Sequence, residues 1–242
     1  MNLTVNKKLF LENVLSPSSK LSDNLCLEFT DIESNVSRLK TIVTSTDNTT
    51  ILLANIPCEV KDSFKCVIPD CKTFLRLFSG IENDLVTLVI EDNTVRYKSS
   101  SFSFKYHLLD DLYSSGKKSI SEEKINQLQF DTTFELSRSK FAEILKFNSI
   151  VPDAEKLYFI TEGSKVFNKL GDEQKSNTNE ITLEASDNYE GSSLTETLPL
   201  NIQSLLLLSF STEVIKVHIN QKLKIFLFET PNTRYVISGL VK

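Results

Sequence analysis

Basic side chains recur on the polar faces of short segments whose apolar residues have helical spacing. Lys72 and Arg76 are four residues apart, so they share one face of a helix. Lysine and arginine bind phosphate groups without reading base sequence. The chemistry open to this set is therefore sequence-independent contact with a nucleic-acid backbone, and the simpler interpretation is a series of solvated helix faces. The set comprises Lys7, Lys8, Lys72, Arg76, Arg138, Lys140 and Lys146.

Acidic residues dilute this set, and the chain as a whole is acidic. The formal net charge is -5 at pH 7. Glu12, Asp70 and Glu143 lie in or beside the same segments, and a fourth such segment carries no base. Because phosphate attraction is local and is screened beyond about 8–10 Å, a basic patch matters more than the net charge. The sequence therefore predicts a weak contact.

The residues that enzymes and metal sites need are scarce. There are two histidines, six scattered glycines and four cysteines. No phosphate-binding loop, dinucleotide fingerprint or G-x-S-x-G elbow is present. Cys26, Cys58, Cys66 and Cys71 form no C-x-x-C pair and have no histidine nearby, which argues against zinc and favours buried free thiols. We predict no catalytic residue, no metal and no cofactor.

The composition is that of a soluble globular protein. Hydrophobic residues make up 40% and charged residues 24% of the 242 residues, an ordinary balance. No run approaches the roughly 20 apolar residues of a membrane span. Residues 1–11 lack the continuous apolar core of a signal peptide. We therefore expect a cytoplasmic protein with no membrane partner.

A pattern that occurs four times would position the basic residues. Each time, a strand-like residue precedes a residue type that favours helix N-caps, and a short amphipathic segment follows. The predicted caps are Asn6, Asp70, Ser137 and Asn201, at intervals of 64, 67 and 64 residues. Such regular spacing indicates a duplicated architecture.

Segments between the predicted helices have the alternation and turn boundaries of strands. In the first half they are residues 25–29, 39–44, 49–56, 85–91, 94–98 and 102–108. In the second half they are residues 156–161, 165–170, 180–186, 214–220, 222–229 and 234–240. Each quarter is thus a short helix with three or four strands, and the fold class is α+β. Two quarters make a domain of ordinary size, so we expect domains at residues 1–112 and 131–242, joined by a linker at residues 113–130.

In this order and spacing, four stretches resemble the DNA polymerase sliding clamps, which are processivity factors, and especially the T-even bacteriophage type. Residues 72–78 and 91–95 resemble the helix, strand and turn of the first clamp domain. Residues 183–191 resemble the strand and loop before the fourth helix, and residues 233–237 resemble the terminal strand. The resemblance covers the whole chain and extends to proliferating cell nuclear antigen. It implies the DNA clamp fold, in which two duplicated domains each pack two short helices on antiparallel sheets.

Clamp rings contain six such domains, so the resemblance implies a homotrimer of this two-domain chain. The helices would line the hole around double-stranded DNA, and the sheets would form the outer wall. Residues 102–109 of one subunit would pair with residues 180–186 of the next. The implied function in DNA replication is a ring that slides on duplex DNA and tethers the replicative DNA polymerase.

The resemblance also implies an outer groove, under the interdomain linker, that accepts an apolar peptide from the polymerase. The matching positions are Val43, Leu128, Phe130, Ile237 and Leu240. Ordinary core packing explains each of these residues equally well. A clamp loader is the remaining partner that the resemblance implies.

Two other classes of function stay open on the sequence alone. One is a structural or assembly protein built mainly of strands. The other is a clamp-like monomer that binds a protein or single-stranded DNA, the latter with salt-sensitive affinity for short oligonucleotides. The mass of the oligomer in solution is the most informative single measurement among these classes.

Overall fold

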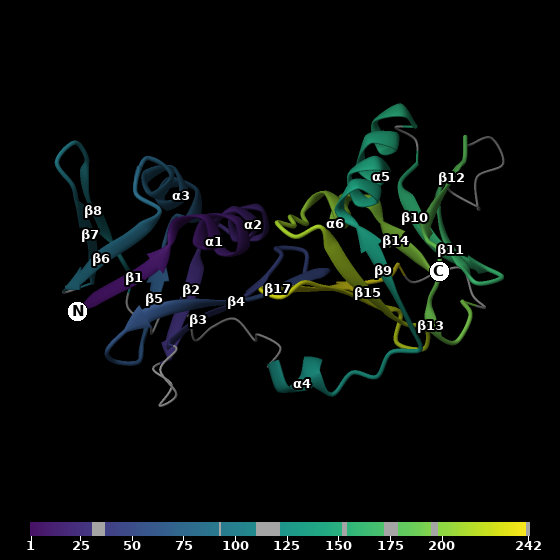
Figure 1. Ribbon diagram of the computed structural model, residues 1–242, viewed down its shortest axis with the longest axis horizontal. Coiled ribbons are helices and arrows are strands. Elements are labelled where there is room, and N and C mark those ends of the chain that lie inside the picture. Colours follow the sequence, from purple (N-terminus) through teal and green to yellow (C-terminus); the bar gives the residue numbers. More distant parts are fainter. Residues whose placement is uncertain are drawn as a thin grey trace. The chain divides into compact units, whose positions relative to one another are not determined.

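A computed structural model describes residues 1–30, 37–91, 93–109, 122–151, 154–171, 179–194 and 198–240. The chain divides into an N-terminal unit, Met1–Glu122, and a C-terminal unit, Glu123–Lys242 (Figure 1). Of the predicted linker at residues 113–130, residues 113–121 lie outside the described residues. Its described part begins with helix α4 (Glu122–Asn126).

The N-terminal unit is built on an antiparallel sheet with the strand order β5-β2-β3-β4-β1-β6-β7-β8. Its strands are β1 (Asn2–Asn6), β2 (Leu25–Thr30), β3 (Ser37–Thr44), β4 (Thr50–Val60), β5 (Phe64–Ile68), β6 (Leu85–Glu91), β7 (Thr94–Lys98) and β8 (Ser103–His107). A helical segment follows β1 and consists of α1 (Lys7–Phe10), the π-helix η1 (Leu11–Leu15) and α2 (Ser16–Leu21). Helix α3 (Cys71–Ser79) follows β5 and packs against η1 and α2 on the same side of the sheet (Figure 1).

The C-terminal unit has two antiparallel sheets, with the strand orders β13-β9-β15-β16-β17 and β12-β11-β10-β14. The strands are β9 (Thr132–Ser137), β10 (Lys156–Glu162), β11 (Lys165–Gly171), β12 (Ile181–Ser186), β13 (Glu190–Gly191), β14 (Pro199–Asn201), β15 (Val214–Asn220), β16 (Ile225–Glu229) and β17 (Thr233–Ser238). Helix α5 (Arg138–Ile150) follows β9, and helix α6 (Ile202–Leu206) follows β14. The predicted α+β class is confirmed, with sheets dominating and short helices beside them.

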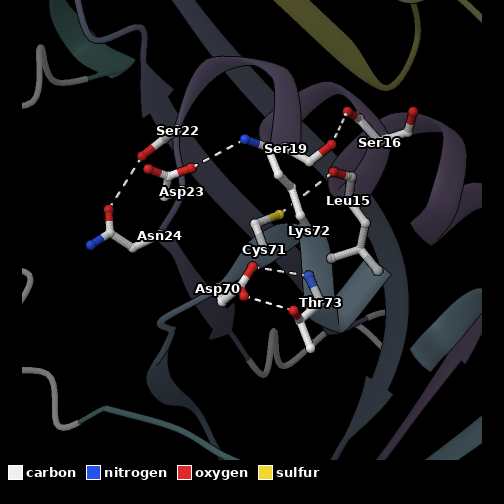
Figure 2. Close-up of polar contacts among 10 residues, drawn as sticks. All are labelled: Leu15, Ser16, Ser19, Ser22, Asp23, Asn24, Asp70, Cys71, Lys72 and Thr73. Atoms are coloured by element: carbon white, nitrogen blue, oxygen red, sulfur yellow. Dashed lines mark hydrogen bonds and ion pairs between the residues drawn. The ribbon is translucent and has the colours of Figure 1, made fainter. Parts of the chain in front are cut away.

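All four predicted helix N-caps are confirmed. In each case the cap side chain accepts a hydrogen bond from a main-chain amide of the first helical turn, which has no partner within the helix. The bonds are Leu9 N to Asn6 Oδ1 (3.0 Å), Thr73 N to Asp70 Oδ1 (2.9 Å), Lys140 N to Ser137 Oγ (3.2 Å) and Gln203 N to Asn201 Oδ1 (2.9 Å). Figure 2 draws the Asp70 cap. These bonds fix where each helix begins, and hence which side chains project from its first turn.

Aromatic rings join the helices of the N-terminal unit to one another and to its sheet. The rings of Phe10 and Phe78 meet edge to face, with centroids 5.0 Å apart. Phe74 meets Tyr106 of β8 at 5.1 Å. The Tyr106 hydroxyl also donates to the main-chain oxygen of Asp70 at 2.9 Å, so the edge strand β8 is fastened to the start of α3.

A second aromatic chain joins α5 to the sheet of the C-terminal unit. Phe141 of α5 meets Phe210 at 5.0 Å, and Phe210 lies 6.4 Å from Phe228 of β16. Phe228 pairs with Val217 of β15 across the sheet. Because paired residues share a face of the sheet, α5 covers the face that carries Val217.

The prediction of a strand at residues 222–229 is wrong at its start, because the observed strand begins at Ile225. Lys224 has a φ of 55°, which is a left-handed conformation that a strand cannot contain. Asn220 Oδ1 accepts a hydrogen bond from Leu223 N at 2.6 Å and closes the turn. Strand β16 therefore starts at Ile225. A side chain that hydrogen-bonds its own turn competes with the sheet for main-chain donors.

The cysteines of the chain are free, and Cys58, Cys66 and Cys71 are buried. Burial raises the pKa of Cys58 to about 11 and that of Cys71 to about 12, so both thiols are protonated at neutral pH. Within the described residues, no group of three or more His, Cys, Asp or Glu side chains is placed to hold a metal ion. None of the described helices is long and apolar enough to cross a membrane.

Candidate functional site

Helices α1, α3, α5 and α6 all begin at the same kind of contact with a distant strand, here called the helix-start contact. The main-chain amide of the first helical residue donates to the carbonyl oxygen of an acidic residue just before a strand. The pairs are Lys7 N with Asp84 O (2.7 Å), Cys71 N with Asp23 O (2.6 Å), Arg138 N with Glu213 O (2.7 Å) and Ile202 N with Glu155 O (3.1 Å). The fourfold sequence pattern thus corresponds to one main-chain arrangement repeated four times, twice in each unit.

The predicted basic residues lie at or near the surface on these helices. Exposed side chains are those of Lys8, Lys72, Arg76, Arg138 and Lys146. Lys7 and Lys140 are partly buried. Lys7 Nζ donates a hydrogen bond to the main-chain oxygen of Ile81, so its charge is turned toward the protein.

Two of the predicted cations contact carboxylates of their own unit. Lys72 Nζ lies 3.4 Å from Asp23 Oδ1, next to the helix-start contact at Cys71 (Figure 2). Lys140 Nζ lies 3.2 Å from Glu184 Oε1, which belongs to β12. Any anion that approaches these two lysines competes with a carboxylate.

The other exposed cations have no such competitor among the described residues. Lys8 on α1, Arg76 on α3, and Arg138 and Lys146 on α5 form no ion pair with another described residue. These four groups can reach an anion without breaking an internal ion pair. Helix α6 contributes no base.

The linker segment, here residues 126–131, is held against the C-terminal unit by hydrogen bonds at both of its ends. The residues that hold it come from β15, the turn after it, and β17. The bonds are Arg234 Nη1 to Asn126 Oδ1 (2.6 Å), Asn220 Nδ2 to Gln129 O (2.6 Å), Gln221 N to Asp131 Oδ2 (2.8 Å) and Asp131 N to Ile219 O (2.9 Å). The segment therefore has a defined position on this unit.

Phe130 of the linker segment lies against His218 of β15, with ring centroids 5.4 Å apart. The Nδ1 atom of His218 is 2.9 Å from Thr133 Oγ1, and its Nε2 atom is 3.3 Å from Glu229 Oε2. Burial lowers the pKa of His218, and the nearby Glu229 carboxylate opposes this shift. The imidazole beneath Phe130 is therefore neutral at neutral pH.

The linker segment and α5 occupy opposite faces of the same sheet. Ile215, Val217 and Ile219 of β15 are buried, and α5 covers the face that carries Val217. His218 alternates with these residues and therefore points to the other face. The exposed cations of α5 and the linker segment are thus separated by the thickness of a sheet.

The residues predicted for a partner-peptide groove fall into two groups. Leu128, Phe130 and Leu240 are partly exposed. Val43 of β3 is 4% exposed and Ile237 of β17 is fully buried. Only the first group is accessible to a ligand without a rearrangement of the chain.

His218, Asn220 and Arg234 position the linker segment, and the sequence alone did not identify them. Asn220 is 91 residues from Gln129, and Arg234 is 108 residues from Asn126. No local pattern connects partners so far apart. The one available signal was His218 in a strand otherwise rich in buried aliphatic residues, and a lone histidine there does not indicate a role.

No model of a protein family matches the sequence, and no curated protein sequence matches it. Solved structures do match. The A. fulgidus PCNA chain, in a structure with the C-terminal region of FEN-1 bound, has a TM-score of 0.77 and 13% identity, covering 100% of this chain and 98% of that chain. The PCNA2–PCNA3 complex from Sulfolobus tokodaii gives a TM-score of 0.74 at 14% identity, with 99% of both chains covered. The DNA polymerase sliding clamp from Bacillus subtilis gives 0.72 at 16% identity, covering 100% of this chain and 64% of that chain.

The chain has the DNA clamp fold. The predicted fold is thereby confirmed, and its structural neighbours include both PCNA and bacterial clamps. The clamp fold here spans nearly all of the A. fulgidus chain but only 64% of the Bacillus subtilis chain. In length, this clamp-fold chain therefore corresponds to the A. fulgidus subunit.

Proposed function

We propose that this chain is the subunit of a sliding clamp that encircles duplex DNA and tethers a replicative DNA polymerase. The observation that carries the proposal is the clamp fold over the whole chain, which also covers 98% of the A. fulgidus PCNA chain. The Bacillus subtilis neighbour is a DNA polymerase sliding clamp, and the A. fulgidus neighbour binds the C-terminal region of FEN-1. We extend the proposal to the T-even bacteriophage type, which the sequence resembles.

In the proposed clamp, the exposed cations of α1, α3 and α5 face the DNA backbone. Lys8, Arg76, Arg138 and Lys146 supply most of this contact, because each lacks an ion pair with another described residue. Phosphate contacts of this kind are independent of sequence and weaken as salt rises. A weak contact permits sliding, and closure of the ring supplies the long residence on DNA.

The proposed ring is a homotrimer closed through edge strands. Within the described residues, β8 and β12 each end their sheet with one edge unpaired. Phe104 and Tyr106 on β8, and Ile181 and Leu183 on β12, are only partly buried. Pairing β8 of one copy with β12 of the next satisfies both edges and covers these side chains. Three copies of a two-domain chain then complete a six-domain ring.

The linker segment is the proposed docking place for the polymerase. Leu128, Phe130 and Leu240 offer accessible apolar surface, and Phe130 lies on the sheet face opposite α5. A polymerase peptide docked there stays clear of the DNA. The proposal includes a clamp loader as the partner that opens the ring.

Topological linkage distinguishes a ring from any simple DNA-binding protein. The chain is diluted until it dissociates, mixed with a nicked circular plasmid, and concentrated so that rings reassemble around the DNA. A restriction enzyme then cuts the plasmid at one site in half of the sample. Gel filtration at high salt measures the protein that stays with the plasmid in each half.

The proposal expects protein to remain on the intact circle and to leave the cut plasmid. The control is the same plasmid cut before the protein is concentrated, which should retain none. Equal loss from circular and linear plasmid would rule out encirclement. A monomeric mass by light scattering at micromolar concentration would rule out the homotrimer.

A further inference from the structure

Glu184 contacts two lysines at once. Its Oε1 atom lies 3.2 Å from Lys140 Nζ on α5, and its Oε2 atom lies 2.7 Å from Lys165 Nζ on β11. Lys165 also lies 3.8 Å from Asp187 Oδ1. The Glu184 carboxylate on β12 therefore binds Lys140, which was predicted to face DNA, and links it to Lys165 on β11.

These contacts keep Glu184 in its charged form. Hydrogen bonds from Lys165 and Lys140 lower the pKa of the Glu184 carboxyl to about 2. The carboxylate is ionised across the neutral pH range, so it holds both lysines under the conditions in which DNA is replicated.

The contact between Asp23 and Lys72 is less protected than the one at Glu184. The side chains of Lys72 and Asp23 are 62% and 84% exposed, whereas those of Lys140 and Glu184 are 32% and 35% exposed. Highly exposed pairs contribute little, because water and salt screen them. Of the two carboxylates, Glu184 is therefore the stronger competitor for a predicted DNA-facing lysine.

Helix α5 carries a cation that forms an ion pair as well as cations that form none with another described residue. Arg138 and Lys146 are exposed and form no ion pair with another described residue, whereas Lys140 on the same helix is bound to Glu184. A phosphate group that binds Lys146 displaces water and counterions. A phosphate group that binds Lys140 must also displace a carboxylate.

We propose that Glu184 limits the affinity of the clamp for DNA by withholding Lys140 from the phosphate backbone. This inference rests on the proposed function, because it requires α5 to face DNA. Glu184 acts through Lys140 and touches no DNA itself. The result is a contact weak enough for sliding.

The Glu184→Gln variant tests the inference through binding of the full chain to a short linear duplex. Fluorescence anisotropy is measured across a salt series from about 50 to about 200 mM. We expect tighter binding than wild type and a plot of log K against log salt that is steeper by about 0.9 for each additional phosphate that the variant neutralises. Light scattering and circular dichroism check that each variant keeps the mass and the fold of wild type.

The Glu135→Gln variant is the matched control for the change in charge. Glu135 is exposed on β9, where it alternates with buried Phe134 and Leu136. It pairs with Lys216 of β15, on the sheet face opposite α5. We expect this variant to bind DNA as wild type does. An equal increase in affinity in both variants would mean that net charge, and not release of Lys140, raises the affinity, and would overturn the inference.

A double-mutant cycle identifies the lysine through which Glu184 acts. In the Lys140→Gln background, the increase in affinity from Glu184→Gln should largely disappear. Lys140→Gln alone should lower the affinity less than Lys146→Gln does, since Glu184 already holds Lys140. Equal losses from these two lysine variants would overturn the inference even if Glu184→Gln failed to fold.

The proposed function and the inference about Glu184 would be contradicted by different results. If wild type binds no duplex at the lowest salt, and Arg138→Gln changes nothing, then α5 does not face DNA and the proposed function loses its DNA contact. If wild type binds and Arg138→Gln weakens binding, but Glu184→Gln brings no increase in affinity, then only the role of Glu184 is wrong.

Discussion

Phe130 is the residue on which the proposed docking of the polymerase most directly depends. One side of its ring lies against His218, and the side chain is still partly exposed. It therefore offers a preformed apolar contact at a position that hydrogen bonds of the neighbouring Gln129 and Asp131 hold in place. Apolar and aromatic anchors of this kind carry much of the free energy of peptide binding.

Phe130→Asp should abolish stimulation of the replicative polymerase encoded in the same genome, because a charge in the docking surface repels an apolar peptide. The oligomer should keep its mass. Processivity on primed circular DNA measures the first effect and light scattering the second. Gln129→Asp, which places the same charge on the adjacent exposed residue, should retain stimulation. Undiminished stimulation by Phe130→Asp would remove this residue from the docking surface.

His218 gives the C-terminal unit a dependence on pH. Its neighbours are Phe130, Thr133, Glu229 and Lys216, and burial is the largest influence, so its pKa in the folded state lies below the ordinary 6.5. The unfolded chain then takes up a proton before the folded chain does as pH falls. The contribution of His218 to stability is complete above pH 6.5 and is lost as pH falls through the lowered pKa.

His218→Gln should remove this component, so that the variant loses less stability on acidification than wild type does. Urea unfolding on either side of pH 6.5, the ordinary pKa, measures the difference. Glu229→Gln should enlarge the loss, because Glu229 opposes the downward shift. Identical pH profiles for wild type and His218→Gln would contradict a lowered pKa.

Single residues were predictable from the sequence where their role is local. Asn6, Asp70, Ser137 and Asn201 were identified as caps because a cap acts within three residues of itself. The ion pair of Lys140 was not predictable, because Glu184 is 44 residues away in the chain. The sequence therefore indicates which side chains are basic, and only the fold shows which of them are already neutralised.

Strand β8 is the element through which the proposed closure of a ring is most easily tested. Leu108 N donates to Asn93 O and Ser99 N to Phe102 O, so the hydrogen-bonded positions of β8 alternate with positions whose amides point to the open edge. In the β7–β8 register, Lys105 falls on the second kind of position. Its amide is therefore available to a neighbouring copy.

Lys105→Pro should convert the proposed trimer to monomers, because proline removes an outward-pointing donor and leaves the β7–β8 bonds intact. Light scattering at micromolar concentration measures the mass. Lys105→Thr removes the same charge and keeps the amide, so it should stay trimeric. If the proline variant keeps the mass of a trimer, the ring closes through another surface.

Strands with regular alternation were predicted closely, and irregular elements were not. The segments at residues 85–91, 94–98 and 214–220 coincide with β6, β7 and β15. The start of β16 was wrong because a residue with positive φ, Lys224, stands inside an apparently strand-like run. The first helical segment continues through the π-helix η1 to Leu21, and no periodicity in the sequence marks this π-helix.

At the scale of the whole molecule, an acidic chain is compatible with the proposed role. The net charge of -5 belongs to the whole surface, whereas the unpaired cations of the predicted set, among the described residues, are confined to α1, α3 and α5. A ring need not attract DNA strongly, since closure holds it there. The spacing of the caps in the sequence pointed to a duplicated chain, whereas the proposed joining of copies through residues 102–109 and 180–186 came from the resemblance alone, because no local pattern marks which strands end a sheet.

The helix-start contacts also imply an order of events during synthesis. In each unit they are nested: the pair Cys71–Asp23 lies within Lys7–Asp84 along the chain, and Ile202–Glu155 lies within Arg138–Glu213. Closing a longer loop costs more conformational entropy, so the inner contact is expected to form first and to shorten the path for the outer one. The start of α1 is made before Asp84, so its contact stays open until Asp84 has left the ribosome. Each unit is thus expected to assemble from its middle outward, with its first helix fixed near the end.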